Sequence, residues 1–538
     1  MRPRKLPPPW RLFAATVTLL VAIPLLVVAS AMLHPDRETW RHLAENVLAE
    51  LVVHTLLLAV GVSVATALLG TALAWLTAVC EFPGRRLFSW SLMLPLAVPA
   101  YVTGFVLVGL LDFTGPVQTL LREALGPDLR LPPIRSGGGA ALALTLALYP
   151  YVYLLARNAF LSQGRRALEV GQSLGLDRRQ GFLRIALPLA RPWIAGGVAL
   201  VAMETLADFG TVAVFNYDTF TTGIYKAWYS LFSLPAAAQL ASVLMLLVLG
   251  VLLLEQHMRA GMRYTQAGRA GQARERIVLR GAARWGATLL CGAVLAAAFL
   301  VPVGQLALWA LEVAVRDLDS RYWGYLARSL LLAGGAALMI ASVALLLAYA
   351  RRRHPDTWMN LMVRISTLGY AVPGAVLAIG IYLPIAWFDH AFVALMRETL
   401  GREAGPLLSG TLLAMLSAYM VRFLAVAHEP VSAALQRVTA SMDEAARSFG
   451  LTTRQLLARV HLPLLRGGTL TAVLLVFVDV MKEMPITLMT RPFGWDTLAT
   501  RIFEMTSEGE WERAALPAVA LVLAGLVPVI LLTRQTER

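Results

Sequence analysis

Lysine, cysteine and charged residues of either sign are scarce in this chain of 538 residues. Asp, Glu, Lys and Arg together make up only 15% of it, whereas hydrophobic residues make up 58%. The mean hydropathy is +0.66. A soluble protein of this length carries more charge and fewer apolar residues. The composition therefore excludes an ordinary soluble domain and indicates a membrane protein.

The scarce residue types also exclude several kinds of functional site. The three lysines, Lys5, Lys226 and Lys482, follow no Gly-rich P-loop pattern, so the sequence contains no Walker-type ATP site. The two cysteines, Cys80 and Cys291, offer neither a disulfide framework nor a soft metal site. No His cluster with metal-ligand spacing and no G-x-S-x-G motif is present, which argues against a membrane-embedded enzyme. We expect a chain that performs no covalent chemistry and binds no cofactor tightly.

Apolar segments of about 20 residues, the length that spans a bilayer, recur along the whole chain. Lipid forces each spanning segment to satisfy its own backbone hydrogen bonds, so we expect an all-α, polytopic membrane protein. The predicted spans are twelve in number: 11–32, 51–79, 88–111, 139–157, 193–214, 236–255, 285–311, 328–350, 363–386, 407–427, 467–489 and 513–533.

The net charge of +14 could indicate nucleic-acid binding, but the distribution of arginine argues against it. Arginines concentrate in alternate loops, among them 157–191, 256–284 and 351–353. This is the pattern of the positive-inside rule, and with twelve spans it places both termini in the cytoplasm. We therefore expect a membrane-lipid environment and no nucleic-acid partner.

The first apolar segment has a second interpretation. Basic residues from Arg2 to Lys5, the apolar stretch and Ala29-Ser30-Ala31 also resemble a cleavable signal peptide. The apolar stretch is longer than such peptides usually have, and the second half of the chain has a matching span at 285–311. We favour a retained span.

One polar loop occurs twice, at 167–189 and 442–464, with identical internal spacing. The matching pairs, each 275 residues apart, are Glu169 and Glu444, Gly175 and Gly450, Arg179 and Arg454, Gln180 and Gln455, Arg184 and Arg459, and Pro188 and Pro463. Six spans separate the copies, so the two halves share one orientation and are related by a pseudo-two-fold axis along the membrane normal. We predict a first membrane domain at 1–256, an Arg-rich cytoplasmic connector at 257–284 and a second membrane domain at 285–538.

Each copy of the loop is predicted to form two short helices around a turn. Gly175 and Gly450 can adopt the positive φ that ends the first of these helices. His461 stands where the first copy has Ala186. We expect this lone histidine to be a contact residue rather than a ligand or a switch.

The pattern Glu444-Ala445-Ala446, then Gly450 and Leu462-Pro463, resembles the EAA loop of ABC importer permeases. The resemblance implies the type I ABC importer permease fold with two parallel six-helix repeats. It also implies that each loop docks on a cytoplasmic ATPase. The first copy reads Glu169-Val170-Gly171 and lacks both alanines, so its docking surface is expected to fit less tightly. The implied coupling residues are Glu169, Gly175, Glu444, Ala445, Ala446 and Gly450.

Over nearly its whole length the chain resembles the fused permeases of ferric-iron importers. The segments 204–211, 218–225, 479–485 and 491–500 carry this likeness. It implies a bacterial inner-membrane location, two copies of an ATPase that bind ATP and Mg²⁺, a periplasmic binding protein, and ferric iron as substrate. Fused thiamine permeases share the layout, although an organic cation should need an aromatic-lined cavity. A secondary transporter is the other alternative, but it has no need of paired loops.

Two pairs of acidic residues fall inside predicted spans. Glu204 and Asp208 are four residues apart, as are Asp479 and Glu483, so each pair is expected to share one helix face. Ionisable groups at this depth usually face a bundle interior or a wet cavity, and oxygen ligands suit a hard cation. We predict that all four line the translocation path as transient metal ligands. Alternatively, the acids pair with Lys482 or with interhelical donors and fix helix packing. Further oxygen donors are predicted at the entrance: Tyr217, Asp218 and Tyr225.

Overall fold

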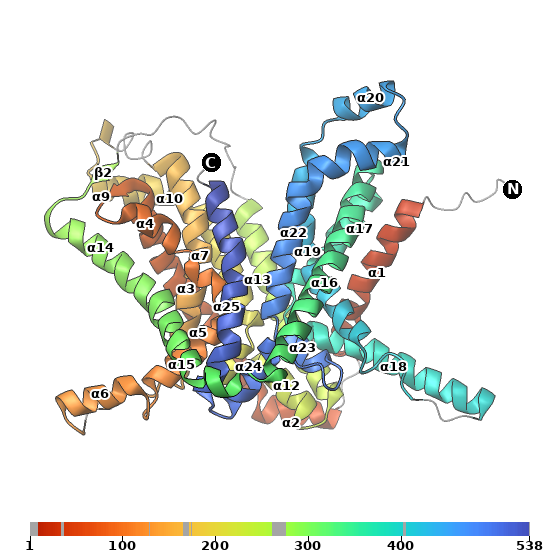
Figure 1. Ribbon diagram of the computed structural model, residues 1–538, viewed down its shortest axis with the longest axis horizontal. Coiled ribbons are helices and arrows are strands. Elements are labelled where there is room, and N and C mark those ends of the chain that lie inside the picture. Colours follow the sequence, from red (N-terminus) through yellow and green to blue (C-terminus); the bar gives the residue numbers. More distant parts are fainter. Residues whose placement is uncertain are drawn as a thin grey trace. The chain divides into compact units, whose positions relative to one another are not determined.

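The computed structural model describes residues 9–33, 37–128, 130–164, 172–173, 175–260, 276–401 and 405–536 (Figure 1). Nearly all of this is helical, which confirms the predicted all-α class. In the described part of the chain the strands are β1 (Cys80–Glu81) and β2 (Ile277–Val278), which form one short parallel pair.

The helices of the first half of the sequence are α1 (Pro9–Ser30), α2 (Arg37–Asn46), α3 (Leu48–Val79), α4 (Arg85–Ser91), α5 (Ala100–Leu111), α6 (Pro116–Leu125), α7 (Gly137–Ala159), α9 (Arg178–Gly181), α10 (Leu187–Ala207), α11 (Gly210–Val214), α12 (Phe220–Tyr229) and α13 (Leu234–Ala260). Those of the second half are α14 (Gly281–Leu295), α15 (Val301–Asp317), α16 (Ser320–Arg353), α17 (Thr357–Ser366), α18 (Gly374–Leu400), α19 (Leu412–Gln436), α20 (Ala440–Ser448), α21 (Thr453–Leu456), α22 (Leu462–Lys482), α23 (Pro485–Thr490), α24 (Leu498–Ser507) and α25 (Trp511–Thr536).

Shorter turns interrupt or extend these helices. Leu94–Ala97 and Leu368–Ala371 are 3₁₀ turns, and Phe160–Gly164, Phe182–Ala186, Ala296–Leu300 and Leu457–His461 are π-helical turns. The turns Phe182–Ala186 and Leu457–His461 occupy matching positions of the two repeated loops, 275 residues apart. The repeat is therefore visible in local backbone conformation as well as in sequence.

Eleven helices within the described residues are long and apolar enough to cross a membrane. They account for eleven of the twelve predicted spans. The twelfth, 513–533, lies within the helix α25, part of whose side chains falls outside the described residues. The polytopic architecture is therefore as the sequence predicts, although several boundaries differ.

Two predicted spans, 88–111 and 363–386, are not continuous helices. A short helix and a 3₁₀ turn come first in each, and the long helix begins only after Pro99 or Pro373. Both prolines have extended backbone conformations and immediately precede the first helical residue. Proline has no N–H to donate within a helix, so it starts these helices more readily than it continues them.

The chain forms two compact units that do not follow the halves of the sequence. Unit 1 comprises Met1–Arg41, Ile224–Met245 and Asp319–Arg501, and unit 2 comprises His42–Gly223, Leu246–Leu318 and Ile502–Arg538. Unit 1 thus combines α1 with helices of the second half, and unit 2 combines α14, α15 and α25 with helices of the first half. The predicted boundary at 257–284 separates the two sequence repeats and not the two packing units, and it stays a prediction.

Each unit is built around the same three helices of the repeat. In unit 1, α16, α19 and α22 pack against one another, and α1 packs against α17 and α18. In unit 2, the equivalent helices α3, α7 and α10 pack together, and α15 packs against α25 and α5. Within unit 1, α20 and α21 lie at one end of α16, α19 and α22 (Figure 1).

Glycine allows the closest approaches within these three-helix cores. A Cβ on Gly70 of α3 would lie 2.9 Å from the Cβ of Val152 in α7, and one on Gly197 of α10 would lie 2.8 Å from the Cα of Val152. In unit 1, a Cβ on Gly468 of α22 would lie 2.7 Å from the carbonyl oxygen of Pro430 in α19. Without a hydrophobic driving force between helices in lipid, such small residues permit the close packing that holds the bundle together.

The two repeats also share a polar contact outside the loops. The backbone N–H of Phe220 donates to Thr55 Oγ1 at 3.2 Å in unit 2, and the N–H of Leu498 donates to Ser329 Oγ at 2.8 Å in unit 1. These four residues occupy matching positions of the two repeats. The likeness predicted from the sequence therefore extends to individual hydrogen bonds.

Candidate functional site

The second copy of the repeated loop has the predicted shape. Its first helix, α20, is followed by Gly450 with a φ of 78°. The N–H of Leu451 donates to the carbonyl of Ala446, five residues back, which is the hydrogen bond of a Schellman cap. The short helix α21 follows, so the prediction of two helices around a glycine turn is confirmed.

The first copy is described only in part. Glu169 and its neighbours 165–171 lie outside the described residues. Gly175 has a φ of 76°, as predicted, and α9 follows it. The turn and the second helix of this copy therefore match those of the other.

A capping box that the sequence prediction overlooked starts the second helix of each copy. Gln180 accepts from the N–H of Asp177, and its own N–H donates to the Asp177 carboxylate at 2.6 Å. In the other copy, Gln455 accepts from the N–H of Thr452 at 2.9 Å, and its N–H donates to Thr452 Oγ1 at 3.4 Å. The spacing of Asp or Thr followed three residues later by Gln is the sequence signal for this motif.

The outer face of α20 combines an acid with apolar side chains. Glu444 and Ala445 are exposed, whereas Ala446 is buried. Met442 is exposed as well, and Phe449 at the end of the helix is 85% exposed. The face of α20 with Glu444 and Ala445, and Phe449 at its end, are therefore accessible to a partner.

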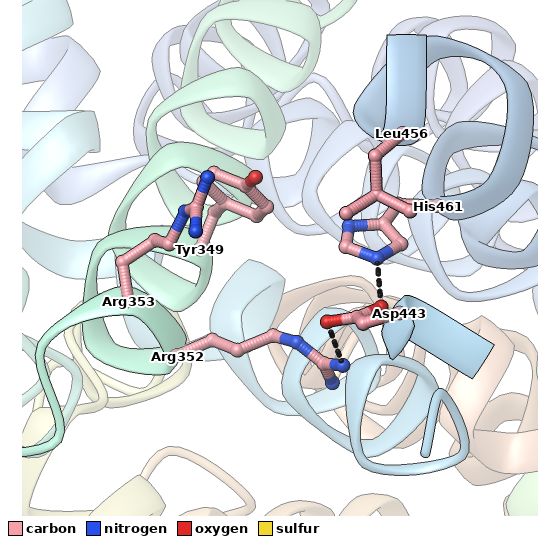
Figure 2. Close-up of a pocket in the computed structure, with 6 residues that line it drawn as sticks. All are labelled: Tyr349, Arg352, Arg353, Asp443, Leu456 and His461. Atoms are coloured by element: carbon pink, nitrogen blue, oxygen red, sulfur yellow. Dashed lines mark hydrogen bonds and ion pairs between the residues drawn. The ribbon is translucent and has the colours of Figure 1, made fainter. Parts of the chain in front are cut away.

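A charged cluster attaches α20 to the long helices of unit 1 (Figure 2). Asp443 accepts from Arg352 Nη2 at 2.8 Å and from His461 Nε2 at 2.7 Å. The Arg352 Nη1 atom also donates to the carbonyls of Val438 at 2.6 Å and Leu435 at 3.2 Å. The end of α16, the end of α19, the helix α20 and the start of α22 are thereby held together. The predicted contact role of His461 is confirmed.

The electrostatics of this cluster favour an ionised Asp443. Its burial opposes ionisation, but the hydrogen bonds from Arg352 and His461, together with the positive charge of Arg352, outweigh burial and lower the pKa of Asp443. The carboxylate can only accept hydrogen bonds, so His461 must carry a hydrogen on Nε2. Arg352 and Asp443 were not recognised as site residues from the sequence, because neither has a charged counterpart in the first copy.

The predicted helical faces of the membrane acids require correction. The helix α10 ends at Ala207, and Asp208 is extended with a ψ of 131°. The helix α22 likewise ends at Lys482, and Glu483 is extended with a ψ of 122°. The acids of each pair therefore do not share one continuous helix face, and the predicted spans 193–214 and 467–489 are each broken at the second acid.

Hydrogen bonds from the following short helix explain both breaks. Asp208 accepts from the N–H of Val212 at 3.1 Å and from the hydroxyl of Thr211 at 2.9 Å. Glu483 accepts from the N–H groups of Ile486 and Thr487, each at 3.1 Å. These side chains satisfy N–H groups that have no partner within the new helix. Both acids therefore have a structural role as helix caps, which differs from the predicted pairing with Lys482 or with interhelical donors.

The other two acids, Glu204 and Asp479, are half-buried on α10 and α22. Glu204 and Asp208 belong to unit 2, and Asp479 and Glu483 belong to unit 1. No group of three or more His, Cys, Asp or Glu residues in the described ranges could hold a metal ion. That the four acids line one path stays a prediction.

The residues predicted at the entrance are divided between the units in the same way. In unit 2, the ring of Tyr217 stacks on His54 with centroids 4.3 Å apart, and His54 Nδ1 lies 3.0 Å from the carbonyl of Asp218. Burial and the nearby Glu50 raise the pKa of Tyr217, so its phenol is neutral at neutral pH. In unit 1, the ring of Tyr225 stacks on that of Tyr229 at 5.0 Å.

Comparison with known proteins relates this architecture to membrane transport. A family described as "Binding-protein-dependent transport system inner membrane component" matches residues 68–264 and, a second time, residues 340–538. The two matches contain the two copies of the loop. They also contain α7, α10, α19 and α22 in full, together with the C-terminal parts of α3 and α16.

Individual relatives are named as transport permeases. The chain is 27% identical to an "Fe(3+)-transport system permease protein" of Haemophilus influenzae over 496 residues, which cover 90% of each chain. It is 24% identical to a "putative ferric transport system permease protein" of the same organism, over 83% of this chain and 71% of that one. A sulfate transport system permease protein of Salmonella typhimurium is 28% identical over 45% of this chain and 89% of its own. With two matches that together cover most of its length, the chain belongs to the family of binding-protein-dependent transport system inner membrane components, as a multi-pass permease of the inner membrane.

Proposed function

We propose that the chain is the permease of an ATP-driven importer that moves ferric iron from the periplasm to the cytoplasm. The choice of ferric iron as the substrate rests on the similarity, over 90% of both chains, to a permease named for Fe(3+) transport. The matches to sulfate and molybdenum permeases are limited to 45% of this chain or less. The scarcity of thiol and imidazole groups and the presence of four carboxylates within the spans suit a hard cation.

The repeated loops supply the docking surfaces for two copies of a separate ATPase, which binds ATP and Mg²⁺. This proposal rests on the exposed face of α20 with Glu444, Ala445 and Phe449, and on the matching turn at Gly175. Ala446, which is buried, stabilises the helix from inside. A periplasmic binding protein delivers the substrate at the opposite side of the membrane, and both termini are cytoplasmic. The arginine-rich loops support this orientation.

The translocation path runs beside the helix breaks at Asp208 and Glu483. Irregular backbone at membrane depth is tolerated only where it is buried in protein or lines a wet cavity. Broken helices at matching positions of two repeats are typical of the substrate path in transporters. Glu204 and Asp479, one turn before each break, then act as transient oxygen ligands of the metal. A path without a preformed ligand cage binds the ion weakly enough to release it.

The substrate is tested by the ATPase activity of the complex with its ATPase and its binding protein. We expect the ferric-loaded binding protein to raise the rate of ATP hydrolysis several-fold over the apo binding protein. Binding proteins loaded with thiamine or molybdate serve as the comparison. Stimulation by either of these, without stimulation by the ferric form, would discard iron and leave the family assignment intact.

A further inference from the structure

A small cavity lies between the end of α16 and the second loop in unit 1 (Figure 2). Its volume is about 240 Å³, and its lining residues are Tyr349, Arg352, Arg353, Asp443, Leu456 and His461. Drug-sized ligands occupy cavities of roughly 300–1,000 Å³. This cavity is smaller than that range and therefore suits a small ligand.

The first repeat has no such set of charges. On α3, Trp75, Ala78 and Val79 occupy the positions of Tyr349, Arg352 and Arg353. Ala186 stands in the position of His461. The rings of Trp75 and Phe182 pack 4.5 Å apart, and Trp75 also packs on Phe160 at 5.1 Å. One repeat thus fills this place with aromatic side chains, whereas the other surrounds a cavity with polar groups. A role shared by both loops does not explain the difference.

The charges around the cavity are not balanced. Arg352 and Asp443 form an ion pair, which leaves the second arginine, Arg353, without an acidic partner among the described residues. The guanidinium of Arg353 lies 5.8 Å from the ring centroid of Tyr349. Figure 2 shows both of these side chains on the α16 side of the cavity and His461 on the loop side. The cavity therefore carries a net positive charge and favours an anion.

His461 defines the anion more closely. Its side chain is only 2% exposed, and its ring contacts Tyr349 with centroids 5.8 Å apart. In the neutral imidazole, Nε2 donates to Asp443 and Nδ1 is then an acceptor, and this buried atom has no hydrogen-bond partner among the described residues. A buried acceptor without a donor costs about 1–3 kcal/mol. An anion that also carries a hydroxyl group can donate to Nδ1 and accept from Arg353.

We propose that this cavity binds inorganic phosphate in a form that retains at least one hydroxyl group. Its hydroxyl donates to His461 Nδ1, and its other oxygens accept from the Arg353 guanidinium. Arg352 and Asp443 hold the two walls of the cavity together through their ion pair. Sulfate has the same shape and carries no proton at neutral pH, so it fails to satisfy Nδ1. The site belongs to the second repeat alone and is independent of which substrate the chain transports.

The test is equilibrium binding of radiolabelled orthophosphate to the full chain in nanodiscs of zwitterionic lipid at neutral pH. We expect saturable binding at one site per chain, and competition by unlabelled sulfate at least tenfold weaker than by unlabelled phosphate. Arg353→Gln is expected to weaken phosphate binding at least tenfold. Arg351→Gln is the matched control, because Arg351 is exposed, donates to Asn360 at 2.8 Å and does not line the cavity.

Several outcomes would overturn the proposal: no saturable binding, equal competition by sulfate, or equal affinity of the Arg353→Gln and Arg351→Gln variants. The comparison of sulfate with phosphate uses the unaltered chain, so it tests the proposal even if a variant fails to fold. Adenosine monophosphate serves as a further competitor. Competition as strong as that of orthophosphate would show that the site takes any phosphate monoester, and would overturn the assignment to the free ion.

Discussion

The side chains that differ between the two repeats are more informative than those they share. Hydrogen bonds attach the second loop to its unit through Asp443, Arg352 and His461. The aligned residues of the first repeat are Leu168, Ala78 and Ala186. The shared glutamates and glycines indicate what both loops do. The unshared charges give the second loop an attachment that the aligned apolar residues of the first repeat cannot form.

Arg352→Gln tests this attachment. The substitution removes the ion pair with Asp443 and the hydrogen bonds to Leu435 and Val438, while both charged side chains are largely buried. A hydrogen bond to a charged group contributes about 1.5–3 kcal/mol. We expect amide hydrogen exchange in α20 to become at least tenfold faster. Arg353→Gln, which leaves the ion pair intact, should change this rate little. Equal effects of the two variants would show that the ion pair does not hold the loop.

Acid should loosen the same attachment. The pKa of Asp443 is lower in the folded chain than its usual value of about 3.9. The stabilisation that Asp443 provides is therefore fully present above pH 4 and is lost as the pH falls through the folded pKa. We expect the excess protection of α20 in the wild type over Asp443→Asn to persist from pH 7 to pH 5. It should shrink below about pH 4. An excess that disappears above pH 5 would contradict the assigned partners.

Among the helices, the glycine turn of the second loop has a clear energetic role. Gly450 has a φ of 78° with no atom near its missing Cβ, so only backbone strain opposes a side chain there. That strain is about 1–2 kcal/mol for a residue with a Cβ. We expect Gly450→Ala to loosen α20 and to lower ATP-driven transport severalfold. Gly467→Ala is the control, since Gly467 has equally open space and normal helical φ in α22. Equal transport by both variants would contradict the role of the turn.

Of the two acids near the end of α10 and of α22, one caps the following helix and the other is assigned to the transport path. Glu483→Ala leaves the buried N–H groups of Ile486 and Thr487 without their acceptor, which costs about 1–3 kcal/mol per group. We expect a lower thermal unfolding midpoint in detergent. Asp479→Asn should slow transport, because we assign Asp479 to the path. If transport survives Glu204→Gln, Asp208→Asn, Asp479→Asn and Glu483→Gln, the path proposal fails.

The sequence predicted the elements better than it predicted their ends. Hydropathy identified the spans, and the spacing around Gly175 and Gly450 identified both loop turns. The sequence prediction missed the helix breaks at Asp208 and Glu483. Two acids four residues apart can lie on one face of a continuous helix, but the second acid can equally well cap a new helix. Only the hydrogen bonds to Val212 and Ile486 decide between them. The prolines 99 and 373 fall inside predicted spans and proved to be helix starts.

In the molecule as a whole, the repeat and the folding unit are different divisions of one chain. Unit 1 takes α1 from the first half of the sequence, and unit 2 takes α14, α15 and α25 from the second. Hydropathy reports which segments enter the membrane and carries no information on which helices pack together. The repeated core, in contrast, was predictable, because α3, α7 and α10 match α16, α19 and α22 in sequence position as well as in packing.

The proposed function requires that import is coupled to ATP hydrolysis. Its most direct test is uptake of radioactive iron into proteoliposomes that contain this chain, its ATPase and ATP, with the ferric-loaded binding protein on the outer side. Matched vesicles lack either the ATP or the ATPase. We predict that iron accumulates only when both are present. Accumulation without the ATPase would identify a secondary transporter, and ATP-driven uptake of another solute with no uptake of iron would contradict the proposed substrate.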